Sequence, residues 1–412
     1  MKYELVCGLE THVELSTKTK IFCSCRSHFG SDPNTNCCPI CIGLPGTLPK
    51  LNKEVVRYAI MAGLATHCEI NLISKMDRKN YVYPDLPKAY QISQYDLPLC
   101  KNGYVELESG KKIRIDRIHI EEDAGKLVHK GNDILIDYNR GGVPLIEIVT
   151  CPDISSSDEA KEYIEKLQSI MRYINVSDCK MQEGSMRCDV NISVRPEGET
   201  EFGVRTEIKN MNSITFITKA IDYEFERQTE IIKSGGKISQ ETLRYLEETN
   251  STESMRNKEN ANDYRYFREP DLVTIKTSME EIEKYKMDLP EFASDRYKRY
   301  VSEYDISPSD AKLIIKYKKI SDFFEKSIKG INNPKIVSNL ILGVIFRYIE
   351  SESDKQEFNI KISPESLNEL VLLVQENKIN INLAKKSLGQ MIETGKKVLE
   401  VIPKDFLQGI SN

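Results

Sequence analysis

The sequence contains no apolar run long enough to cross a membrane and no large excess of charge of either sign. No stretch approaches the roughly 18 consecutive apolar residues of a membrane span, so we expect no membrane domain. The first residues, MKYEL, enter a strand pattern directly and lack the layout of a signal peptide, so we expect a cytoplasmic protein. The net charge of −5 gives no overall basic signal for nucleic acid, although a local basic patch remains open.

Two widespread motifs of nucleotide-binding and hydrolytic enzymes are also missing. The chain has no GxxxxGKS/T phosphate loop, and the segment EEDAGK at residues 121–126 does not form one. It has no GxSxG elbow and no other plausible arrangement for a nucleophile. Acyl hydrolysis through a serine is therefore not expected.

What is present is a soluble chain with enough apolar mass for real cores. The 412 residues suggest two to three domains, with 40% hydrophobic and 29% charged residues. Strand patterns dominate up to about residue 275, and helical spacing dominates from residue 289 onward. Within the first part, amphipathic helices are predicted after Asn52, after Ser156 or Ser157, and after Ser213. Residues 251–262 are polar and predict a mobile loop.

Eleven cysteines in a reducing compartment are not expected to form disulfides. Six are scattered and are interpreted as small buried hydrophobes: Cys7, Cys68, Cys100, Cys151, Cys179 and Cys188. The other five bracket one loop as a CxC pair followed by CCPxC, and four thiolates in tetrahedral number suit a closed, structural zinc site. The expected ligands are Cys23, Cys25, Cys38 and Cys41. A swap between Cys37 and Cys38 remains open, as does a thiol-rich loop without metal.

The segment LIEIV at residues 145–149 reads as a buried strand with one carboxylate, Glu147. A buried charge needs a partner, so Glu147 calls for a cation. Strand alternation places Glu10, His12 and Glu14 on one face of residues 6–15. Residues 117–123 run at the same period into three acids. A sheet whose polar face gathers carboxylates around a hard metal ion fits this pattern; a solvated sheet face with an ordinary salt bridge fits it as well.

Two later strands carry the same plan with both signs of charge. Residues 187–194 place Arg187, Asp189, Asn191 and Ser193 on one face, and residues 204–209 do the same with Arg205, Glu207 and Lys209. This mixture is what a nucleotide and metal site needs. The cationic loop at residues 75–85 offers Arg78 and Lys79 to phosphates or, alternatively, to solvent. The lysine-rich helical region beyond residue 290 allows either phosphate contacts or a solvated surface.

Long strings of the sequence resemble one family, the B subunits of the tRNA-dependent amidotransferases (the GatB/GatE family). The strings cover most of residues 1–290 and comprise GLETHVEL (8–15), DRKNY (77–81), YPDLPK (83–88), YQISQ (90–94), HIEEDAGK (119–126), PLIEIV (144–149), GSMRCDVNIS (184–193) and DYRYF (263–267). The CxC and CPxC pairs also occur in many members.

The resemblance implies a ligase for translation. Such enzymes use ATP and Mg²⁺ to phosphorylate the side-chain carboxylate of Glu-tRNA(Gln) or Asp-tRNA(Asn), and ammonia then displaces the phosphate. The ammonia comes from a separate amidase subunit (GatA), and a small linker subunit (GatC) completes a heterotrimer. The implied fold class is α+β, with an open antiparallel-sheet cradle similar to the catalytic domains of glutamine synthetase and the guanido kinases, followed by an all-α region.

The resemblance also implies roles for particular residues. The Mg²⁺ candidates are Glu10, His12, Glu121, Glu122 and Glu147, and of these Glu10, Glu122 and Glu147 are expected to be catalytic. Lys79, Arg187 and Lys209 are expected to bind phosphates or to steady the activated carboxylate. Lys79, Arg187, Asp189 and Glu207 are the candidates for the nucleotide.

Three parts are expected: a catalytic cradle over residues 1–290 with the zinc knuckle at 22–42, a helical domain over 291–355, and a shortened helical tail over 356–412 that binds tRNA in the family. The sequence departs from the family at FREPD (267–271) and near ETLRY (241–245), where paired arginines are usual. The short tail leaves open a paralogue that amidates a non-tRNA carboxylate. A non-catalytic, zinc-stabilised scaffold is a further alternative.

Overall fold

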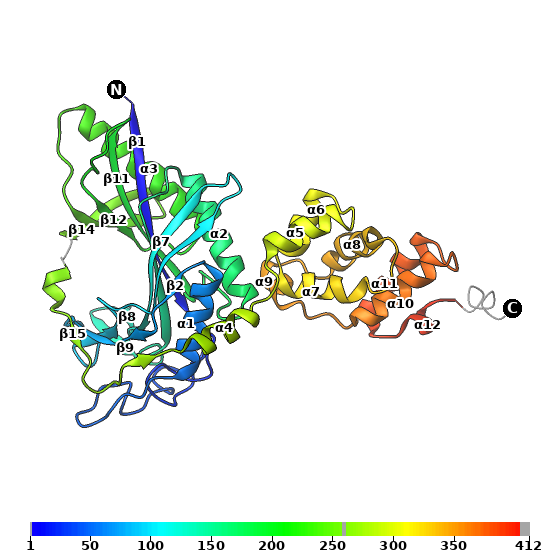
Figure 1. Cartoon of the computed structure of the whole chain (residues 1–412), viewed down its shortest axis with the longest axis horizontal. Coiled ribbons are helices and arrows are strands. Elements are labelled where there is room, and N and C mark those ends of the chain that lie inside the picture. Colours follow the sequence, from blue (N-terminus) through cyan, green and yellow to red (C-terminus); the bar gives the residue numbers. More distant parts are fainter. Residues whose placement is uncertain (1, 258–260, 404–412) are drawn as a thin grey trace. The chain divides into compact units, whose positions relative to one another are not determined.

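The first strand, β1 (Tyr3–Glu14), lies in a nine-stranded sheet of the computed structural model, which describes residues 2–257 and 261–403 (Figure 1). The strand order is β14-β13-β12-β11-β1-β10-β7-β6-β2. The other strands of this sheet are β2 (Glu69–Ile70), β6 (Cys100–Glu106), β7 (Lys112–Glu122), β10 (Pro144–Thr150), β11 (Met186–Pro196), β12 (Thr206–Lys209), β13 (Glu241–Leu246) and β14 (Ser251–Asn257).

The sheet is mixed, which differs in one place from the expected antiparallel cradle. Every neighbouring pair is antiparallel except β12 and β13, which run parallel. A parallel pair needs a crossover, and helix α3 (Ile214–Lys233) supplies it. The α+β class predicted from the sequence is confirmed. The loop predicted over residues 251–262 is wrong for Ser251–Asn257, which form the edge strand β14, and residues 258–260 lie outside the described part.

Three capped helices pack on the sheet. They are α1 (Lys53–Ala65), α2 (Ser157–Tyr173) and α3, and the side chains of Asn52, Ser156 and Ser213 accept hydrogen bonds from their first turns. Contacts join α1 to β6 and β7, α2 to β6, and α3 to β11. The apolar strand residues alternate with the polar ones, so Leu9, Val13 and Ile148 are buried while their neighbours face the other side.

Smaller elements border the large sheet. A three-stranded sheet orders β15 (Phe267–Arg268), β4 (Asp77–Asn80) and β5 (Tyr90–Ser93), and β5 contacts β7. Two pairs join β8 (Lys126–Lys130) to β9 (Asp133–Asp137) and β3 (Ile73–Ser74) to β16 (Ile275–Lys276). The 3-10 turn η1 (Ala261–Tyr264) precedes β15, and α4 (Met279–Met287) contacts α1.

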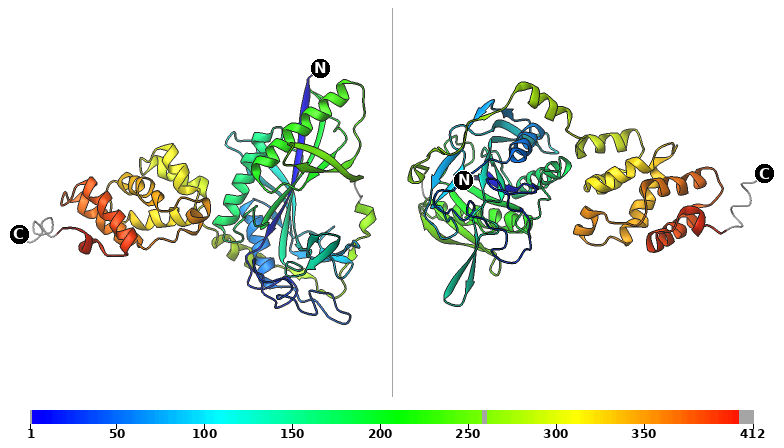
Figure 2. Two further views of the ribbon diagram at one scale, coloured as in Figure 1. Left: turned by 180° about the vertical axis from the view of Figure 1, so that it is seen from behind. Right: turned by 90° about the horizontal axis from the view of Figure 1, so that it is seen from below.

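The chain divides into two compact units, Met1–Leu289 and Pro290–Asn412. The second is helical and is coloured yellow to red in Figure 2. Its elements are α5 (Ala293–Ser302), α6 (Pro308–Ile315), α7 (Lys318–Ser327), α8 (Pro334–Gly343), η2 (Ile345–Arg347), α9 (Glu352–Glu357), α10 (Pro364–Gln375), α11 (Ile381–Thr394) and α12 (Val398–Val401). Proline opens α6, α8 and α10, where a missing N–H costs nothing.

One hydrophobic core holds the helical unit together, and it includes Tyr300, Phe324, Leu340, Leu370 and Leu388. Residues on both sides of position 355 contribute to it, and the division of this region at 355/356 stays a prediction. Among the described residues, no helix has the length and apolar character needed to cross a bilayer.

Candidate active site

A row of four polar residues crosses the centre of the large sheet. The register pairs Arg187 on β11 with His12 on β1, His12 with Glu147 on β10, and Glu147 with His119 on β7. Directly paired residues of antiparallel strands point to the same face. The row therefore gathers side chains that are far apart in the sequence, on the face opposite the packed helices.

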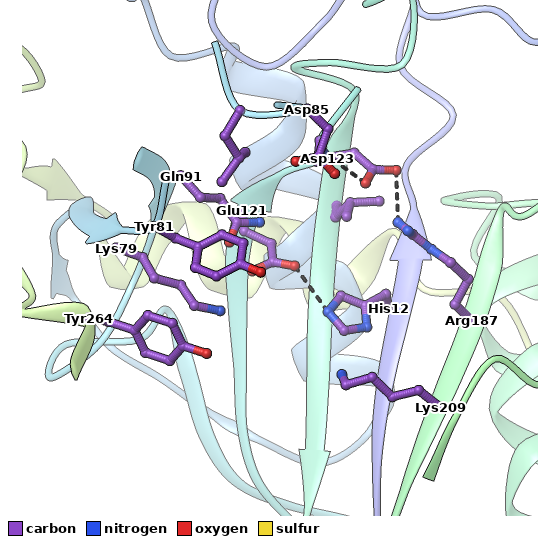
Figure 3. A pocket seen from close by; sticks show the side chains of 13 residues that line it. His12, Lys79, Tyr81, Asp85, Gln91, Glu121, Asp123, Arg187, Lys209 and Tyr264 are labelled. Carbon is purple, nitrogen blue, oxygen red and sulfur yellow. Dashed lines mark hydrogen bonds and ion pairs between the residues drawn. The ribbon is translucent and has the colours of Figure 1, made fainter. Parts of the chain in front are cut away.

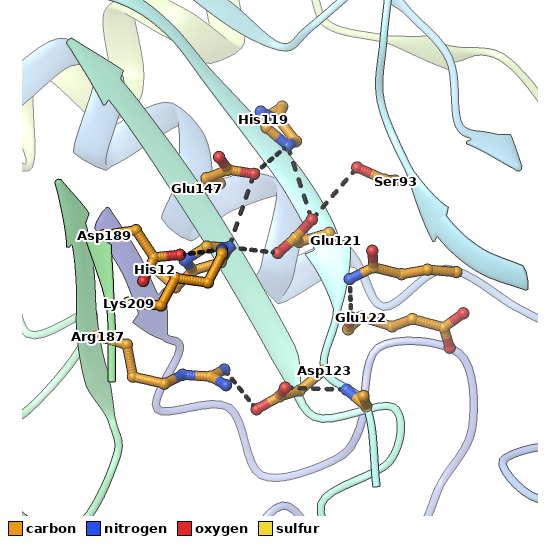
Figure 4. Close-up of polar contacts among 12 residues, drawn as sticks. His12, Ser93, His119, Glu121, Glu122, Asp123, Glu147, Arg187, Asp189 and Lys209 are labelled. Carbon is orange, nitrogen blue, oxygen red and sulfur yellow. Dashed lines mark hydrogen bonds and ion pairs between the residues drawn. The ribbon is translucent and has the colours of Figure 1, made fainter. Parts of the chain in front are cut away.

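Two carboxylates and two imidazoles meet at the middle of this row (Figure 4). His12 Nε2 lies 3.1 Å from Glu121 Oε1 and 3.7 Å from Glu147 Oε2. His119 Nε2 lies 3.0 Å from Glu147 Oε2 and 3.8 Å from Glu121 Oε2. One ligand atom each of His12, Glu121 and Glu147 lies within 4.8 Å of the others, which is a spacing that suits one bound cation. We call these three residues the central cluster.

Burial and charge oppose each other in the central cluster. Burial alone would lower the pKa of His12, but Glu147 and Glu121 outweigh it and raise that pKa to about 9. Burial would raise the pKa of Glu147, but His119 and His12 outweigh it and lower that pKa to about 2. The same two histidines hold the pKa of Glu121 well below its usual range against burial. Both carboxylates are therefore ionised at neutral pH, which is the form that binds a divalent cation.

A second carboxylate group lies beside the central cluster, toward β11 and β12. Ligand atoms of Glu10, Asp189 and Glu207 lie within 4.8 Å of one another. Lys209 Nζ lies 2.6 Å from Asp189 Oδ2 and 3.4 Å from Glu207 Oε1. Burial would lower the pKa of Lys209, but Asp189 and Glu207 outweigh burial and raise the pKa overall, so the ammonium stays charged. Asn191 donates to Glu10 Oε1 at 2.8 Å.

A cavity of about 240 Å³ opens over this face (Figure 3). Its lining includes His12 and Glu121 from the central cluster. It also includes three cations, namely Lys79, Arg187 and Lys209. Lys79 has no carboxylate within salt-bridge distance among the described residues, and its ammonium lies 4.7 Å from the centre of the Tyr264 ring. Burial lowers the pKa of Lys79, but Tyr266, Glu121 and Glu147 outweigh it and raise the pKa overall.

Arg187 is held at one end of the cavity by Asp123. Its Nη2 donates to Asp123 Oδ2 at 2.7 Å, and Arg140 Nε lies 3.6 Å from the same oxygen. The Nε atom of Arg187 is buried and has no hydrogen-bond partner among the described residues. A buried guanidinium N–H left without a partner is costly, so an oxygen-rich ligand in this cavity would satisfy it.

Glu10, Glu147, Asp189 and Glu207 do not line the cavity itself but belong to the two carboxylate groups beside it, whereas Glu122 and Arg78 pair with other residues. Glu122 follows Glu121 on β7 and therefore points to the other face, where its carboxylate accepts from Lys88 Nζ at 2.5 and 2.7 Å and from the Ile92 amide at 2.8 Å. Arg78 pairs with the buried Glu269 at 2.7 Å, whereas its neighbour Lys79 reaches the cavity. The structure thus does not bring Glu122 together with the other metal candidates.

The four cysteines chosen from the sequence do come together. The sulfur atoms of Cys23, Cys25, Cys38 and Cys41 lie within 4.8 Å of one another. Cys37 is not in this group, and its thiol contacts Asn34 and Asn139 instead. The pKa of Cys41 is lowered to about 4, first by a hydrogen bond with Cys23 and, against burial, by the Cys38 amide and the Lys20 ammonium. A stabilised thiolate is a metal ligand, so the group fits a tetrahedral soft metal site.

Sequence reasoning missed two residues of this site, His119 and Asp123. His119 carried a signal, since it has the same strand parity as Glu121 and occupies the strand that ends in three acids. Asp123 lies just beyond the end of β7, where alternation no longer predicts direction.

Comparisons with known proteins agree with this architecture. The sequence matches the family described as GatB/GatE catalytic domain over residues 5–283 and the one described as GatB domain over residues 322–412. Three curated relatives are named as the B subunit of aspartyl/glutamyl-tRNA(Asn/Gln) amidotransferase. The protein of Caldanaerobacter subterraneus subsp. tengcongensis is 53% identical, covering 100% of this chain and 87% of the relative. That of Clostridium novyi is 52% identical, with 96% and 84% coverage, and that of Carboxydothermus hydrogenoformans is 51% identical, with 98% and 85%.

The chain therefore belongs to the GatB/GatE family, and the resemblance predicted from the sequence is confirmed.

Proposed function

We propose that this chain is the carboxylate-activating component of a tRNA-dependent amidotransferase. Its substrate is the side-chain carboxylate of Glu-tRNA(Gln), Asp-tRNA(Asn) or both. Family membership and the names of the relatives support the reaction class. The observation that carries the proposal is one cavity lined both by His12 and Glu121 of the central cluster and by three cations. Phosphoryl transfer depends mainly on positioning and charge neutralisation, and this cavity offers both.

The reaction has two steps. A carboxylate oxygen of the amino acid attacks the terminal phosphorus of ATP, the bond to ADP breaks, and an acyl phosphate forms. Ammonia then attacks the acyl carbon, phosphate leaves, and a proton is lost to give the amide. Lys79 is the cation available to the acceptor carboxylate, because it has no salt bridge of its own among the described residues. Arg187, whose Nε lacks a partner there, is available to a phosphoryl oxygen.

His12, Glu121 and Glu147 are the residues that would hold a divalent cation near the transferred group. Their two carboxylates suit Mg²⁺, and His12 would add one nitrogen ligand once the cation displaces its proton. Such a cation would neutralise charge that develops on the phosphoryl oxygens.

The Glu10–Asp189–Glu207 group with Lys209 supports binding of the nucleotide at the β11–β12 side. Asp189 and Glu207 keep Lys209 charged beside the cavity, and that ammonium can meet polyphosphate oxygens. Glu10 offers a further oxygen ligand for a cation carried by the nucleotide. Glu122 is not part of this arrangement, since it pairs with Lys88 on the other face.

Zinc is our proposal for the Cys23–Cys25–Cys38–Cys41 group, because four thiolates fill a closed site and leave no open position for chemistry. Since the chain offers no nucleophile motif for glutamine hydrolysis, an amidase subunit must supply ammonia, and a linker subunit completes the complex. We place this complex in the cytoplasm, where charged tRNA is used.

The test is conversion of each charged tRNA by the complete complex with ATP and Mg²⁺, using ammonium chloride in place of glutamine. Conversion of either tRNA supports the proposal and names the substrate. ATP turnover with a small carboxylic acid, and none with charged tRNA, would refute this proposal and favour the paralogue that amidates a non-tRNA carboxylate. If the assembled complex turns over no ATP with any acceptor, the result would favour the non-catalytic scaffold.

A further inference from the structure

Two tyrosine-bearing segments meet beside the cavity, although they are far apart in the sequence. The segment Tyr81–Pro84 follows β4, and Tyr264 closes η1 just before β15. Strand β15 pairs with β4, and Asn80 Nδ2 donates to the carbonyls of Tyr264 at 3.0 Å and Arg265 at 2.7 Å. The strand pairing and the hydrogen bonds from the Asn80 side chain fix the two segments side by side.

Five tyrosine rings form a continuous cluster there, which we call the tyrosine cluster: Tyr81, Tyr83, Tyr95, Tyr264 and Tyr266. The ring centres of Tyr81 and Tyr83 lie 5.8 Å apart, and those of Tyr95 and Tyr266 are stacked at 4.4 Å. Tyr81 and Tyr264 stand at 72° with centres 6.2 Å apart, and Tyr264 and Tyr266 stand at 74° with centres 6.1 Å apart. Tyr83 is 47% exposed and Tyr95 is 50% exposed, so the described residues leave these two rings of the cluster open to solvent.

The corner between Tyr81 and Tyr264 opens into the cavity. Both residues line it together with Lys79 (Figure 3). They come from the β4 side, which adjoins β7 through β5, whereas Lys209 and its carboxylates come from β11 and β12 across the sheet. In phosphoryl transfer the attacking and leaving oxygens lie roughly in line, on opposite sides of the phosphorus. With the nucleotide on the β11–β12 side, the acceptor enters from the tyrosine side.

The acceptor carries its own aromatic group to this entrance. Its amino acid is esterified to the last ribose of the tRNA, so the reacting carboxylate is only a few bonds from an unpaired base. Unpaired bases are recognised by stacking on aromatic side chains, and each stacked base contributes about 1–3 kcal/mol.

We propose that the Tyr81–Tyr264 corner stacks the unpaired terminal base of the charged tRNA and thereby aims its amino acid at Lys79 and the central cluster. The inference rests on the proposed function and adds a binding subsite to it. The terminal base is the same in every tRNA, so the subsite recognises the end of the acceptor and does not discriminate between tRNAs.

The sharpest test compares two inhibitors of the complete complex. One is 3′-deoxy-3′-(glutamylamino)adenosine, a stable mimic of the charged end; the other is the matching glutamylamino ribose without a base. Against the wild-type complex, the compound with the base should inhibit about 5- to 150-fold more strongly, which corresponds to one stacked base. Tyr81→Ala and Tyr264→Ala should each reduce this ratio at least fivefold, whereas Tyr81→Phe and Tyr264→Phe should keep it.

This ratio separates stacking from other effects. Both compounds present the same carboxylate, so a change at Lys79, whose ammonium contacts the Tyr264 ring, cancels in the comparison. Tyr104→Ala is the matched control, because Tyr104 stacks on His67 with ring centres 4.4 Å apart and neither residue lines the cavity. That variant should keep the wild-type ratio, and a thermal melt shows whether each variant is folded.

The terminal base of the tRNA and the base of ATP are both adenine, and the Michaelis constants show which of the two binds at the corner. We expect the alanine variants to raise the KM for charged tRNA and to leave the KM for ATP unchanged. A raised KM for ATP with an unchanged inhibitor ratio would place the nucleotide's own base at the corner and overturn the inference. Unchanged values for both would overturn it as well. If the wild-type complex converts no charged tRNA, the proposed function fails first, and the two failures are therefore distinguishable.

Discussion

Replacing Glu147 with glutamine should stop phosphorylation of the acceptor without unfolding the protein. The substitution keeps the shape of the side chain but removes its charge. In the wild-type structure His119 Nε2 lies 3.0 Å from Glu147 Oε2, and the amide oxygen of glutamine can still accept this hydrogen bond. A hydrogen bond to a charged group contributes ~1.5–3 kcal/mol and a neutral one ~1 kcal/mol, so we expect a loss of about 1 kcal/mol in the free energy of unfolding. That corresponds to a fall in Tm of about 2–4 °C.

The effect on rate should be far larger. Removing one preorganised electrostatic group from an active site typically lowers kcat by about 10²–10³-fold. Glu147 is such a group, since it faces both His12 and His119 and stays ionised despite its burial. The assay is ADP release that depends on charged tRNA, first without ammonia and then with ammonium chloride, which also reports amide formation.

Glu4→Gln is the matched control, because Glu4 lies on β1 as His12 does and pairs with Arg195 at 3.0 Å, away from the cavity. It should keep the wild-type rate. Wild-type turnover by a folded Glu147→Gln variant would refute the role given to the central cluster, and so would an equal loss of rate in both variants.

Three further substitutions test other parts of the structure. Cys38→Ser should reduce bound zinc, measured by atomic absorption, and lower Tm, whereas Cys37→Ser should keep about one zinc per chain; equal zinc in both would contradict the assigned ligands. Lys209→Met should raise the KM for ATP at least about tenfold, since it removes a charge-assisted contact of ~1.5–3 kcal/mol, and an unchanged KM would remove Lys209 from the nucleotide site. Glu269→Ala leaves the half-buried Arg78 without its bidentate partner and should lower the free energy of unfolding in urea by ~2–3 kcal/mol; a loss below ~0.5 kcal/mol would show that the pair is not structural.

Strand alternation predicted which residues share the polar face, and the physical reason is the period of two. Glu10 and His12, and likewise Asp189 and Glu207 on their own strands, lie where that period places them. The spacing of the CxC and CPxC pairs also predicted that four cysteines meet, and the structure selects Cys38 over Cys37. The change from strand to helical pattern near residue 289 predicted the boundary between the two units, whereas the α+β class came from the family resemblance.

Other features depend on contacts that the sequence does not display. Glu121 and Glu122 look equivalent in sequence, but the pleat sends them to opposite faces, and only strict parity from His119 selects Glu121. The polar segment Ser251–Asn257 resembles a loop, yet it forms an edge strand, where polar side chains are normal. The contact between Tyr81 and Tyr264 depends on the pairing of β4 with β15, which no local sequence pattern predicts.

The same alternation that builds the site also ties it to the core beneath. On β10, Glu147 projects into the site while Ile146 and Ile148, on either side of it, are fully buried on the helix-covered face. On β1, His12 stands between the buried Thr11 and Val13 in the same way. Because interiors are close-packed, the spacing between these strands is set by the packing of the core residues. The separations within the central cluster are therefore fixed before any ligand binds, which is the preorganisation that electrostatic catalysis requires.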